Sequence, residues 1–396
     1  MAYYLNRKAP RGKRWFVFLG ILIFFAFIFS GGLIIINYHN FGNMFKVVSL
    51  IRSQYLYPVS TNNLIEGATK GIVESLGDPY SIYLDPETYA QLKEQINGTF
   101  GGLGILVGLE NDYLTVMRSY EGTPAYRKGI KAGDIVFKIN NRETKGIDLD
   151  TAISLMRGAA GTKVKLTILR QNEGIKETNQ KLSRKTEFTV ELTREEISIP
   201  TVEGHILKGT KIGYLAISQF TTKTPAELEV VLGKFKKSQV QGILLDLRNN
   251  PGGELRAAVE VAEKFIPKGP VVYVDYRSGK KDTYTVNGSN LNLPLVVLVN
   301  EASASAAEIL AGAIKDRKVG ILIGEKTFGK GVVQTVFNLG NGAGLKLTTA
   351  RYLTPAKHNI HQRGISPDII VKQKLDAEKD LQKEKAVEIL QQKLAA

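Results

Sequence analysis

Two serines and one lysine of this 396-residue chain have the types and settings needed for acyl transfer. Ser303 and Ser305 lie in PLVVLVNEASASAAEILAG, after an apolar run that predicts a buried strand and before an alanine-rich run that predicts a helix. The first N–H groups of a helix have no partner within it, and with the helix dipole they stabilise developing negative charge. A serine nucleophile with an oxyanion hole needs such a position.

Lys330, in GEKTFGKG at residues 324–331, is the candidate base. A lysine accepts the serine's proton only when it is neutral, so we expect burial to lower its pKa from the ordinary value of about 10.4. Serine–lysine pairs are a known variant of the serine catalytic triad. These residues are therefore compatible with a Ser–Lys peptidase site.

The same stretch also has the spacing of a phosphate-binding P-loop, and Asp246 in GILLDLR upstream could be its Mg²⁺ partner. A P-loop needs Ser or Thr directly after the lysine and a helix that follows. Here Gly331 takes that position, and VVQTVF after it favours a strand. The pattern thus disfavours a nucleotide site, and we interpret Asp246 as a residue that shapes the turn at the end of its strand.

A purely structural role for the serine turn is the alternative. Ser305 and Glu308 have the spacing of a capping box, in which the serine satisfies amides of the first helical turn. Spacing also does not choose between Ser303 and Ser305 as the nucleophile. The residues by themselves leave both questions open.

Composition excludes several other chemistries. With zero cysteines the chain has no disulfide, no thiol nucleophile and no Cys-ligated zinc. Its four histidines form no metalloprotease pair, so we expect neither a metal nor another cofactor. The net charge of +15 is scattered outside the N-terminus, which favours anionic lipid or cell-wall polymers over nucleic acid as neighbours.

The N-terminal residues predict a membrane anchor. Trp15–Ile36 is apolar and uncharged, which is enough to span a bilayer core of roughly 30 Å. Residues 1–14 contain no acidic residue but five basic ones, Arg7, Lys8, Arg11, Lys13 and Arg14. This bias puts residues 1–14 in the cytoplasm and the remainder outside. No convincing cleavage site follows Ile36, so we expect an uncleaved single-pass anchor.

Residues 38–97 have apolar side chains at helical spacing and predict a helical segment. Strands, a short helix, an AGD turn, a second helix and a final strand follow. This order, with FGGLGI (100–105), TPA (123–125) and GIKAGDIVFKIN (129–140), resembles a PDZ domain of the bacterial, circularly permuted kind.

That resemblance implies a PDZ domain over residues 98–184. Such domains add an extended peptide to a sheet edge and bind its terminal carboxylate on backbone N–H groups. The matching positions are Gly102, Leu103, Gly104 and Ile105. We therefore expect these four residues to bind a peptide C-terminus.

Residues 185–372 alternate strands and helices, which predicts an α/β core: a mixed sheet with flanking helices. Residues 373–396 predict a charged helix with an apolar stripe formed by Ala386, Ile389, Leu390 and Leu394. We expect this helix to pack on a neighbour rather than to perform chemistry.

LVNEASASAAEILAGAIKD, GEKTFGKGVVQT and the upstream DLRNNPGG, placed after a PDZ-like module, resemble the carboxyl-terminal processing (tail-specific) serine protease family. The resemblance covers about residues 40–370. It implies that Ser305 is the nucleophile, Lys330 the general base and Gln334 the residue that orients the base.

The resemblance also implies backbone oxyanion donors, the N–H of Ala306 and that of Gly252 or Gly253. The chain departs from the family at Ala307, where members often have serine. Because that position is not catalytic, we expect activity to survive the change.

We therefore expect a membrane-anchored serine endopeptidase. It would recognise apolar C-termini of proteins through its PDZ domain and cleave them outside the cytoplasmic membrane. A catalytically silent PDZ scaffold is the rival, against which the intact Ser305, Lys330 and Gln334 argue. Helical segments at both ends also make a homodimer an expectation.

Overall fold

The computed structural model describes residue 21 and residues 38–110, 112–171, 185–373 and 379–395. The chain divides into two compact units, with the boundary between Gly77 and Asp78. Apart from Ile21, the predicted anchor Trp15–Ile36 lies outside the described residues. In the part of the chain that the structure describes, no helix has the length and apolar character needed to cross a bilayer.

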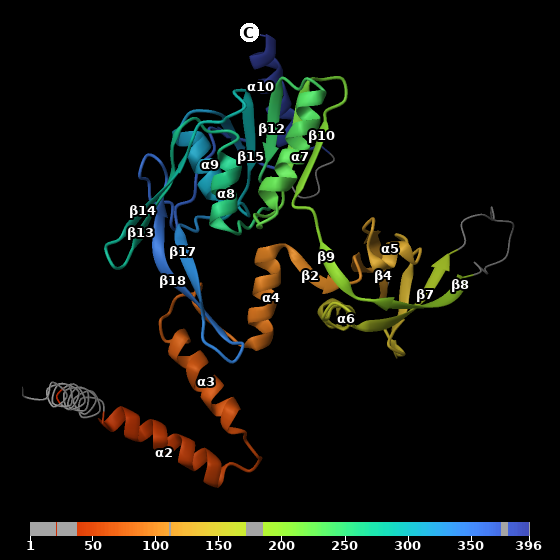
Figure 1. Ribbon diagram of the computed structural model, residues 1–396, viewed down its shortest axis with the longest axis vertical. Coiled ribbons are helices and arrows are strands. Elements are labelled where there is room, and N and C mark those ends of the chain that lie inside the picture. Colours follow the sequence, from red (N-terminus) through yellow and green to blue (C-terminus); the bar gives the residue numbers. More distant parts are fainter. Residues whose placement is uncertain (1–20, 22–37, 111, 172–184, 374–378, 396) are drawn as a thin grey trace, which may run out of the picture. The chain divides into compact units, whose positions relative to one another are not determined.

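The first unit contains two helices, α2 (Tyr38–Gln54) and α3 (Thr61–Glu74), drawn in red and orange in Figure 1. Ser60 caps α3, because its side chain accepts the N–H of Asn63 at 3.1 Å. Apolar side chains of this unit are exposed, among them Leu56 at 81% and Ile72 at 70%. These helices agree with the helical character expected for the start of residues 38–97.

The end of that expected helical segment is not uniformly helical. Ile82–Leu84 form strand β1, which pairs antiparallel with β18 (Gly344–Leu353) of the α/β core. Helix α4 (Pro86–Asn97) follows, with Asp85 as its N-cap. A three-residue strand whose partner lies far away in the sequence leaves no periodic pattern of its own, so the sequence did not predict it.

The PDZ-like module has a sheet of order β3-β4-β5-β7-β8, with β6 paired to β5. Short helices α5 (Pro124–Arg127) and α6 (Leu149–Met156) complete it, and α6 packs its apolar side against the buried sheet residues. The strand bounds are β3 (Ile105–Glu110), β4 (Tyr113–Ser119), β5 (Ile135–Ile139), β6 (Arg142–Glu143), β7 (Lys163–Gln171) and β8 (Lys185–Thr193).

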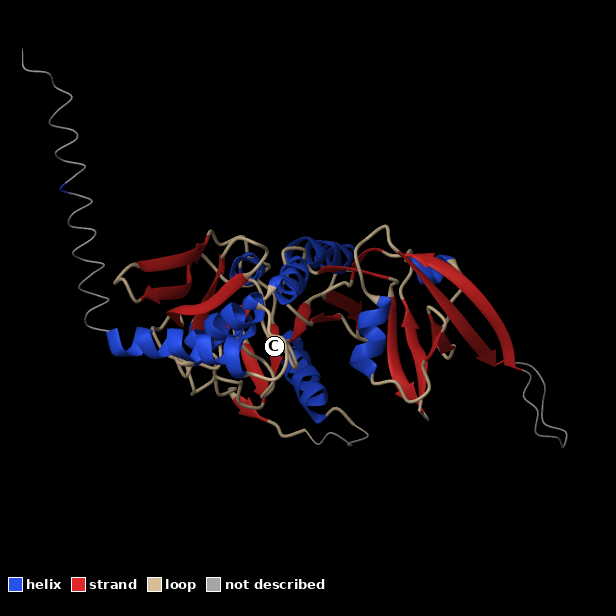
Figure 2. Ribbon diagram, turned by 90° about the horizontal axis from the view of Figure 1, so that it is seen from below, coloured by secondary structure: helices blue, strands red, loops and turns tan. Residues whose placement is uncertain are grey.

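The module extends beyond the expected boundary at residue 184. Strand β8 was assigned to the core from its place in the chain, but it pairs with β7 along its whole length, from Lys163 opposite Thr193 to Gln171 opposite Lys185. These two long paired strands are the red arrows at the right of Figure 2. Strands β2 (Thr99–Gly102) and β9 (Glu195–Ser198) pair where the chain enters and leaves the module.

The main core sheet has the order β10-β11-β12-β15-β16-β19, with β10 antiparallel and the other neighbours parallel. Every residue of β12 and β15 is buried, as their continuous apolar runs predict for parallel strands covered on both faces. The bounds are β10 (Val202–Ile206), β11 (Ile212–Ile217), β12 (Gly242–Asp246), β15 (Leu295–Val299), β16 (Ile321–Gly324) and β19 (Ile369–Ile370).

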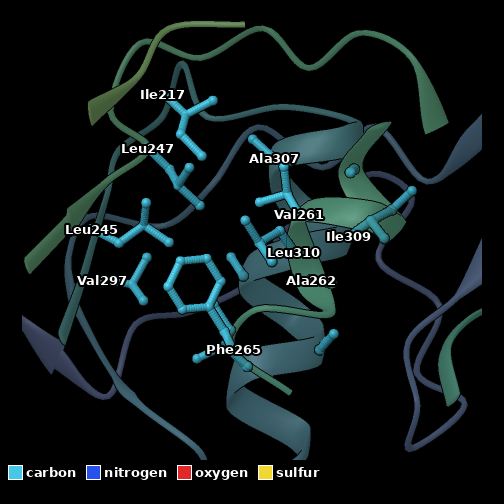
Figure 3. Close-up of a cluster of buried hydrophobic side chains, with 14 of the residues drawn as sticks. Ile217, Leu245, Leu247, Val261, Ala262, Phe265, Val297, Ala307, Ile309 and Leu310 are labelled. Carbon is cyan, nitrogen blue, oxygen red and sulfur yellow. The ribbon is translucent and has the colours of Figure 1, made fainter. Parts of the chain in front are cut away.

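Helices α7 (Thr224–Lys237), α8 (Leu255–Ala262) and α9 (Ala306–Asp316) contribute to one core cluster with this sheet (Figure 1). In Figure 3, Phe265 lies beside Val297 of the sheet, and Leu310 of α9 also faces the cluster. Figure 3 therefore shows how the helix that follows the serine turn is anchored in the core.

Helix α10 (Leu381–Ala395) packs in a second cluster with the same sheet. Ala386 and Leu390 are fully buried there, Ile389 is 8% exposed and Leu394 packs against them. The apolar stripe predicted for the C-terminal helix is therefore confirmed, and α10 covers a sheet face that would otherwise be open to water.

The core contains a second sheet, so the expectation of one mixed sheet was incomplete. It has the order β1-β18-β13-β14, and β17 pairs with β18. The new strands are β13 (Gly269–Tyr276), β14 (Lys281–Val286) and β17 (Val332–Asn338), and all pairs in this sheet are antiparallel. This sheet places the residues that follow Lys330.

Candidate active site

Ser305 is the residue from which helix α9 begins. Its backbone has φ 54° and ψ −115°, a conformation that is costly for a residue with a side chain. Its N–H donates to Oε2 of Glu308 at 2.9 Å, so the glutamate half of the predicted capping box forms. The strained backbone and its hydrogen bond hold Ser305 at the N-terminus of the helix.

Ser303 has a structural role. Its side chain is fully buried, and its Oγ donates to the carbonyl of Leu247 at 2.8 Å. The same oxygen accepts the N–H of Asn300 at 3.0 Å. These bonds join the turn to the residue that follows β12, and they leave Ser305 as the serine that lines a cavity.

Backbone donors for an oxyanion lie beside Ser305. The N–H of Ala306, as the first of helix α9, has no intrahelical acceptor. Gly252 approaches so closely that a Cβ there would lie 2.7 Å from Ser305 Cβ and 2.8 Å from the nitrogen of Ala306. Its own N–H already donates to Oδ1 of Asn250 at 2.8 Å, so Gly253 is the available donor of the two glycines.

Lys330 lies in the loop between β16 and β17 and is half-buried. Burial lowers its pKa, and the nearby positive charge of Lys346 lowers it further, whereas Asp78 and Glu308 act in the opposite direction. Its Nζ lies 4.9 Å from the centre of the Tyr80 ring. The direction of this shift is the one that a lysine general base needs.

Glu308 joins the serine turn to the lysine loop. Its side chain is fully buried and accepts the Thr327 hydroxyl at 2.6 Å, the Gly329 N–H at 2.8 Å and the Lys330 N–H at 2.9 Å, in addition to the Ser305 N–H. In the described chain, two amides of GEKTFGKG therefore bind the protein's own carboxylate. Gly331 stands where a P-loop has Ser or Thr, and strand β17 follows the loop where a P-loop has a helix. The loop therefore lacks both features that a P-loop requires.

Gln334 lies on β17, and its Nε2 donates to Oγ1 of Thr348 at 3.5 Å. Lys330 precedes β17, which begins at Val332, and the pairing of β17 with β18 shifts between Val333 and Gln334. The alternation of side chains along a regular strand therefore does not relate Lys330 to Gln334. The two side chains still line the same cavity.

Tyr352, on β18, lines the same cavity as Ser305 and Lys330. Its hydroxyl donates to the carbonyl of Lys330. Burial, followed by the charge of Glu308, raises the pKa of Tyr352 well above its ordinary value. The phenol therefore stays protonated and available as a donor.

One cavity of about 500 Å³ contains the predicted catalytic residues. We call it the active-site cavity. It is lined by all six residues expected to form the catalytic centre: Ser305, Lys330, Gln334, Ala306, Gly252 and Gly253. The structure thus brings together residues from three separate stretches of the chain.

The four residues predicted to bind a peptide C-terminus all line one groove. Gly102, Leu103, Gly104 and Ile105 line a groove of about 120 Å³, together with Ile153 and Met156 of α6. Gly104 has φ 76°, and a Cβ there would lie 2.2 Å from Cβ of Thr123. Only glycine fits this turn, and it brings the backbone to the groove.

Family models match the chain in three places. Peptidase family S41 matches residues 211–371, the PDZ domain matches residues 115–170, and the activating protease CtpB N-terminal domain matches residues 36–88. The fold resembles that of a putative S41 protease from Bacteroides fragilis, with a TM-score of 0.53 over 87% of this chain and 96% of that chain, at 19% identity.

Two relatives define the class of protease. The chain is 37% identical over 333 residues to the carboxyl-terminal-processing protease of Synechocystis sp., covering 82% of this chain and 75% of that protein. It is 37% identical over 331 residues to the carboxy-terminal processing protease CtpA of Bacillus subtilis, covering 83% and 68%. The chain belongs to peptidase family S41 and is a C-terminal processing serine protease with a PDZ domain.

Several residues around the site were not predicted. Asp78 and Tyr80 come from the segment before β1, and Ser81 of the same segment accepts the N–H of Thr348 at 3.0 Å. Tyr352 and Lys346 come from β18. For Glu308 the capping-box spacing was a signal, but it indicated only the bond to Ser305; the bonds to the lysine loop depend on tertiary structure.

Proposed function

We propose that this protease cuts C-terminal tails of proteins with a Ser305–Lys330 centre, outside the cytoplasmic membrane. The observation that carries the proposal is that Ser305 and Lys330 line one cavity while burial lowers the pKa of the lysine from its ordinary value. A neutral lysine beside a serine at a helix N-terminus is suited to acyl transfer.

In the first step, Lys330 Nζ takes the proton of Ser305 Oγ as that oxygen bonds to the scissile carbonyl carbon. The carbonyl electron pair moves to its oxygen, which the N–H groups of Ala306 and Gly253 stabilise. The intermediate then expels the amine of the tail, which receives its proton from the Lys330 ammonium. The remainder of the substrate stays on Ser305 as an ester.

In the second step, Lys330 takes a proton from water as the hydroxide attacks the ester carbonyl. The Ser305–carbonyl bond breaks, and the ammonium returns its proton to Ser305 Oγ. We assign Gln334 to the orientation of Lys330. Its Nε2 points to Thr348, which leaves the amide oxygen as an acceptor for the lysine amine.

We propose that the PDZ groove selects apolar tails. Strand β3 is the edge of its sheet, and an extended peptide can pair with such an edge. The carbonyls of Leu103 and Gly104 are bonded to Ala125 and Tyr120, whereas their N–H groups have no acceptor among the described residues. Apolar side chains of Ile153 and Met156 face the bound chain's last residues.

The location is part of the proposal. The basic residues before Trp15–Ile36 support an uncleaved anchor with the protease outside. Protease added to intact spheroplasts should degrade the catalytic part, and its protection would contradict this orientation.

We also propose a homodimer, supported by exposed apolar side chains such as Leu56 and Ile72. Light scattering of the purified protein tests it.

The central test compares two serine variants on a fluorogenic peptide with an apolar C-terminus. Ser305→Ala should abolish cleavage while the melting temperature and peptide binding remain. Ser303→Ala should keep part of the turnover but lose about 1–3 kcal/mol of stability, because a buried N–H and carbonyl lose their partner. The opposite pattern would mean that Ser303 is the nucleophile, and no cleavage by the wild type would favour a PDZ scaffold.

A further inference from the structure

A second cavity adjoins the active-site cavity. Its volume is about 600 Å³, and we call it the tail cavity. Four of its lining residues also line the active-site cavity: Leu92, Gln95, Gln219 and Lys346. Three others also line the PDZ groove: Phe100, Arg157 and Ile199. If the PDZ groove binds the C-terminus, as proposed above, substrate residues after the cleaved bond pass through the tail cavity.

Lys346 lies in the wall shared by the two cavities. It is on β18, opposite Ile82 of β1 and Val336 of β17, and its side chain is half-buried. In the described chain it forms no ion pair with any Asp or Glu and donates no side-chain hydrogen bond. The pairing of β18 with β1 and β17 at Lys346 holds the backbone of this residue in place, which limits the positions that its ammonium can occupy.

The charged residues around Lys346 do not neutralise it. The two cavities together are lined by Glu94, Arg157, Glu254, Arg256 and Lys330 besides Lys346. Glu254 already accepts the N–H of Ala257 at 2.5 Å at the start of α8. With Lys330 neutral, as its proposed role requires, the three remaining cations Arg157, Arg256 and Lys346 still outnumber the two carboxylates, so the neighbourhood of Lys346 attracts an anion.

A half-buried ammonium without a counter-ion has lost part of its hydration without gaining a partner. A carboxylate that entered the cavity would restore that loss through a charge-assisted hydrogen bond. Since substrate is the only peptide that must pass this wall, its own carboxylates are the anions that reach Lys346 during each turnover.

We infer that Lys346 forms a subsite that binds a carboxylate of the substrate on the C-terminal side of the cleaved bond. The carboxylate can come from an Asp or Glu side chain within the tail, or from the free α-carboxylate when the tail is only a few residues long. The subsite would give this protease a preference for acidic residues at one tail position, in addition to the apolar C-terminus bound by the PDZ groove.

The test uses the full chain and a set of fluorogenic peptides with one cleavage site. Each peptide has Glu or Gln at one of the first several tail positions, and a parallel set has short tails with a free or an amidated C-terminus. The ratio of kcat/KM for Glu over Gln is measured for the wild type, Lys346→Met and Lys346→Arg, at a pH where the rate no longer rises. Using a ratio cancels any general effect of a substitution on catalysis.

We expect the wild type to prefer Glu at one position by about tenfold, equivalent to about 1.4 kcal/mol. Lys346→Met should reduce that ratio to about one, Lys346→Arg should keep most of it, and added salt should weaken it in the wild type. If the α-carboxylate is the source, the free-over-amide ratio of short tails collapses in Lys346→Met instead. Should Lys346→Met not fold, Lys346→Gln replaces it.

Equal Glu-over-Gln and free-over-amide ratios in the wild type and Lys346→Met would overturn the inference. That result is distinguishable from failure of the proposed function, which would appear as residual cleavage by Ser305→Ala on the same peptides. If the preference for Glu persisted in Lys346→Met, another cation would be responsible for that preference. This result, too, would refute the Lys346 subsite.

Discussion

Lys330, the proposed general base, is the residue whose environment bears most directly on the proposed mechanism. Burial disfavours its ammonium form, and Lys346 adds repulsion from a second positive charge. The carboxylates of Asp78 and Glu308 oppose these effects, but the pKa of Lys330 remains below its ordinary value. The Lys330 amine is therefore neutral over a wider pH range than a lysine in water.

This environment predicts a pH profile. Only the neutral amine accepts a proton, so kcat/KM should rise with pH through the lowered pKa of Lys330 and then level off. Lys346→Met removes a charge that lowers this pKa, so the midpoint of the rise should move to higher pH. Lys346→Arg retains the charge and is the matched control. A midpoint that moves downward in Lys346→Met would contradict the electrostatic argument.

We also expect that no other basic residue can replace Lys330 as the proton acceptor. Lys330→Arg introduces a guanidinium that stays protonated, so we expect turnover close to zero at neutral pH. Lys330→Ala should be equally inactive, because the serine then has no base. Substantial turnover in Lys330→Arg would show that another group accepts the proton.

Glu308 predicts coupled losses of stability and activity. Glu308→Ala leaves four donors, two of them buried and two partly buried, without their acceptor, so we expect the free energy of unfolding to fall by about 3 kcal/mol. Glu308→Gln should fold, but its kcat should fall about 100-fold, as expected when a catalytic group is misplaced by about 1 Å.

Urea unfolding and peptide kinetics measure both effects. Glu301→Gln, an exposed change in the same turn, is the control and should alter neither quantity. If Glu308→Gln kept wild-type kcat, the carboxylate would not be needed to position the lysine loop.

At the scale of elements, the site is formed where two sheets meet one helix terminus. The parallel sheet ends in the serine turn, and helix α9 supplies backbone N–H groups. The antiparallel sheet supplies Gln334, Lys346 and Tyr352 from β17 and β18. Helix α10 supports this arrangement by covering the parallel sheet on the side of Leu244 and Leu298.

Helix α10 should accordingly contribute to stability without touching the site. Leu390 is fully buried, so Leu390→Ala should cost about 2–5 kcal/mol through lost burial and the cavity that remains. Lys393→Ala, on the exposed side of the same helix, should cost less than about 0.5 kcal/mol. Equal effects in chemical denaturation would mean that α10 does not pack on the core in solution.

At the scale of the whole molecule, the proposed function requires two recognition sites to act on one substrate. The PDZ groove presents backbone N–H groups of Leu103 and Gly104, and the active-site cavity contains Ser305 and Lys330. A carboxylate accepts hydrogen bonds from such amides far better than a neutral amide does. The C-terminus of the substrate should therefore affect cleavage at a distance.

Amidating the C-terminus of a long-tailed substrate should raise KM or reduce activation. Steady-state kinetics of the acid and the amide check this, and an internal Gln-for-Glu change far from the cut is the matched control. Identical kinetics for acid and amide would remove the PDZ groove from recognition.

The sequence by itself determined the local features of this protein. The continuous apolar runs of β12 and β15, the PDZ-like order of elements and the stripe of α10 each follow from periodicity within one segment. The glycine after Lys330 and the strand-forming residues beyond it were also enough to disfavour a nucleotide site. Such patterns are readable because each depends on neighbours in the chain.

Tertiary structure decided what depends on contacts between distant residues. Ser303 and Ser305 have nearly the same local sequence, and the buried bonds of Ser303 to Leu247 and Asn300, together with the place of Ser305 at the cavity, separate them. The pairing of β1 with β18 and the four bonds of Glu308 likewise join residues far apart in the chain. The physical reason is that burial, hydrogen-bond satisfaction and the pKa of Lys330 are set by the surroundings in space, which no single segment contains.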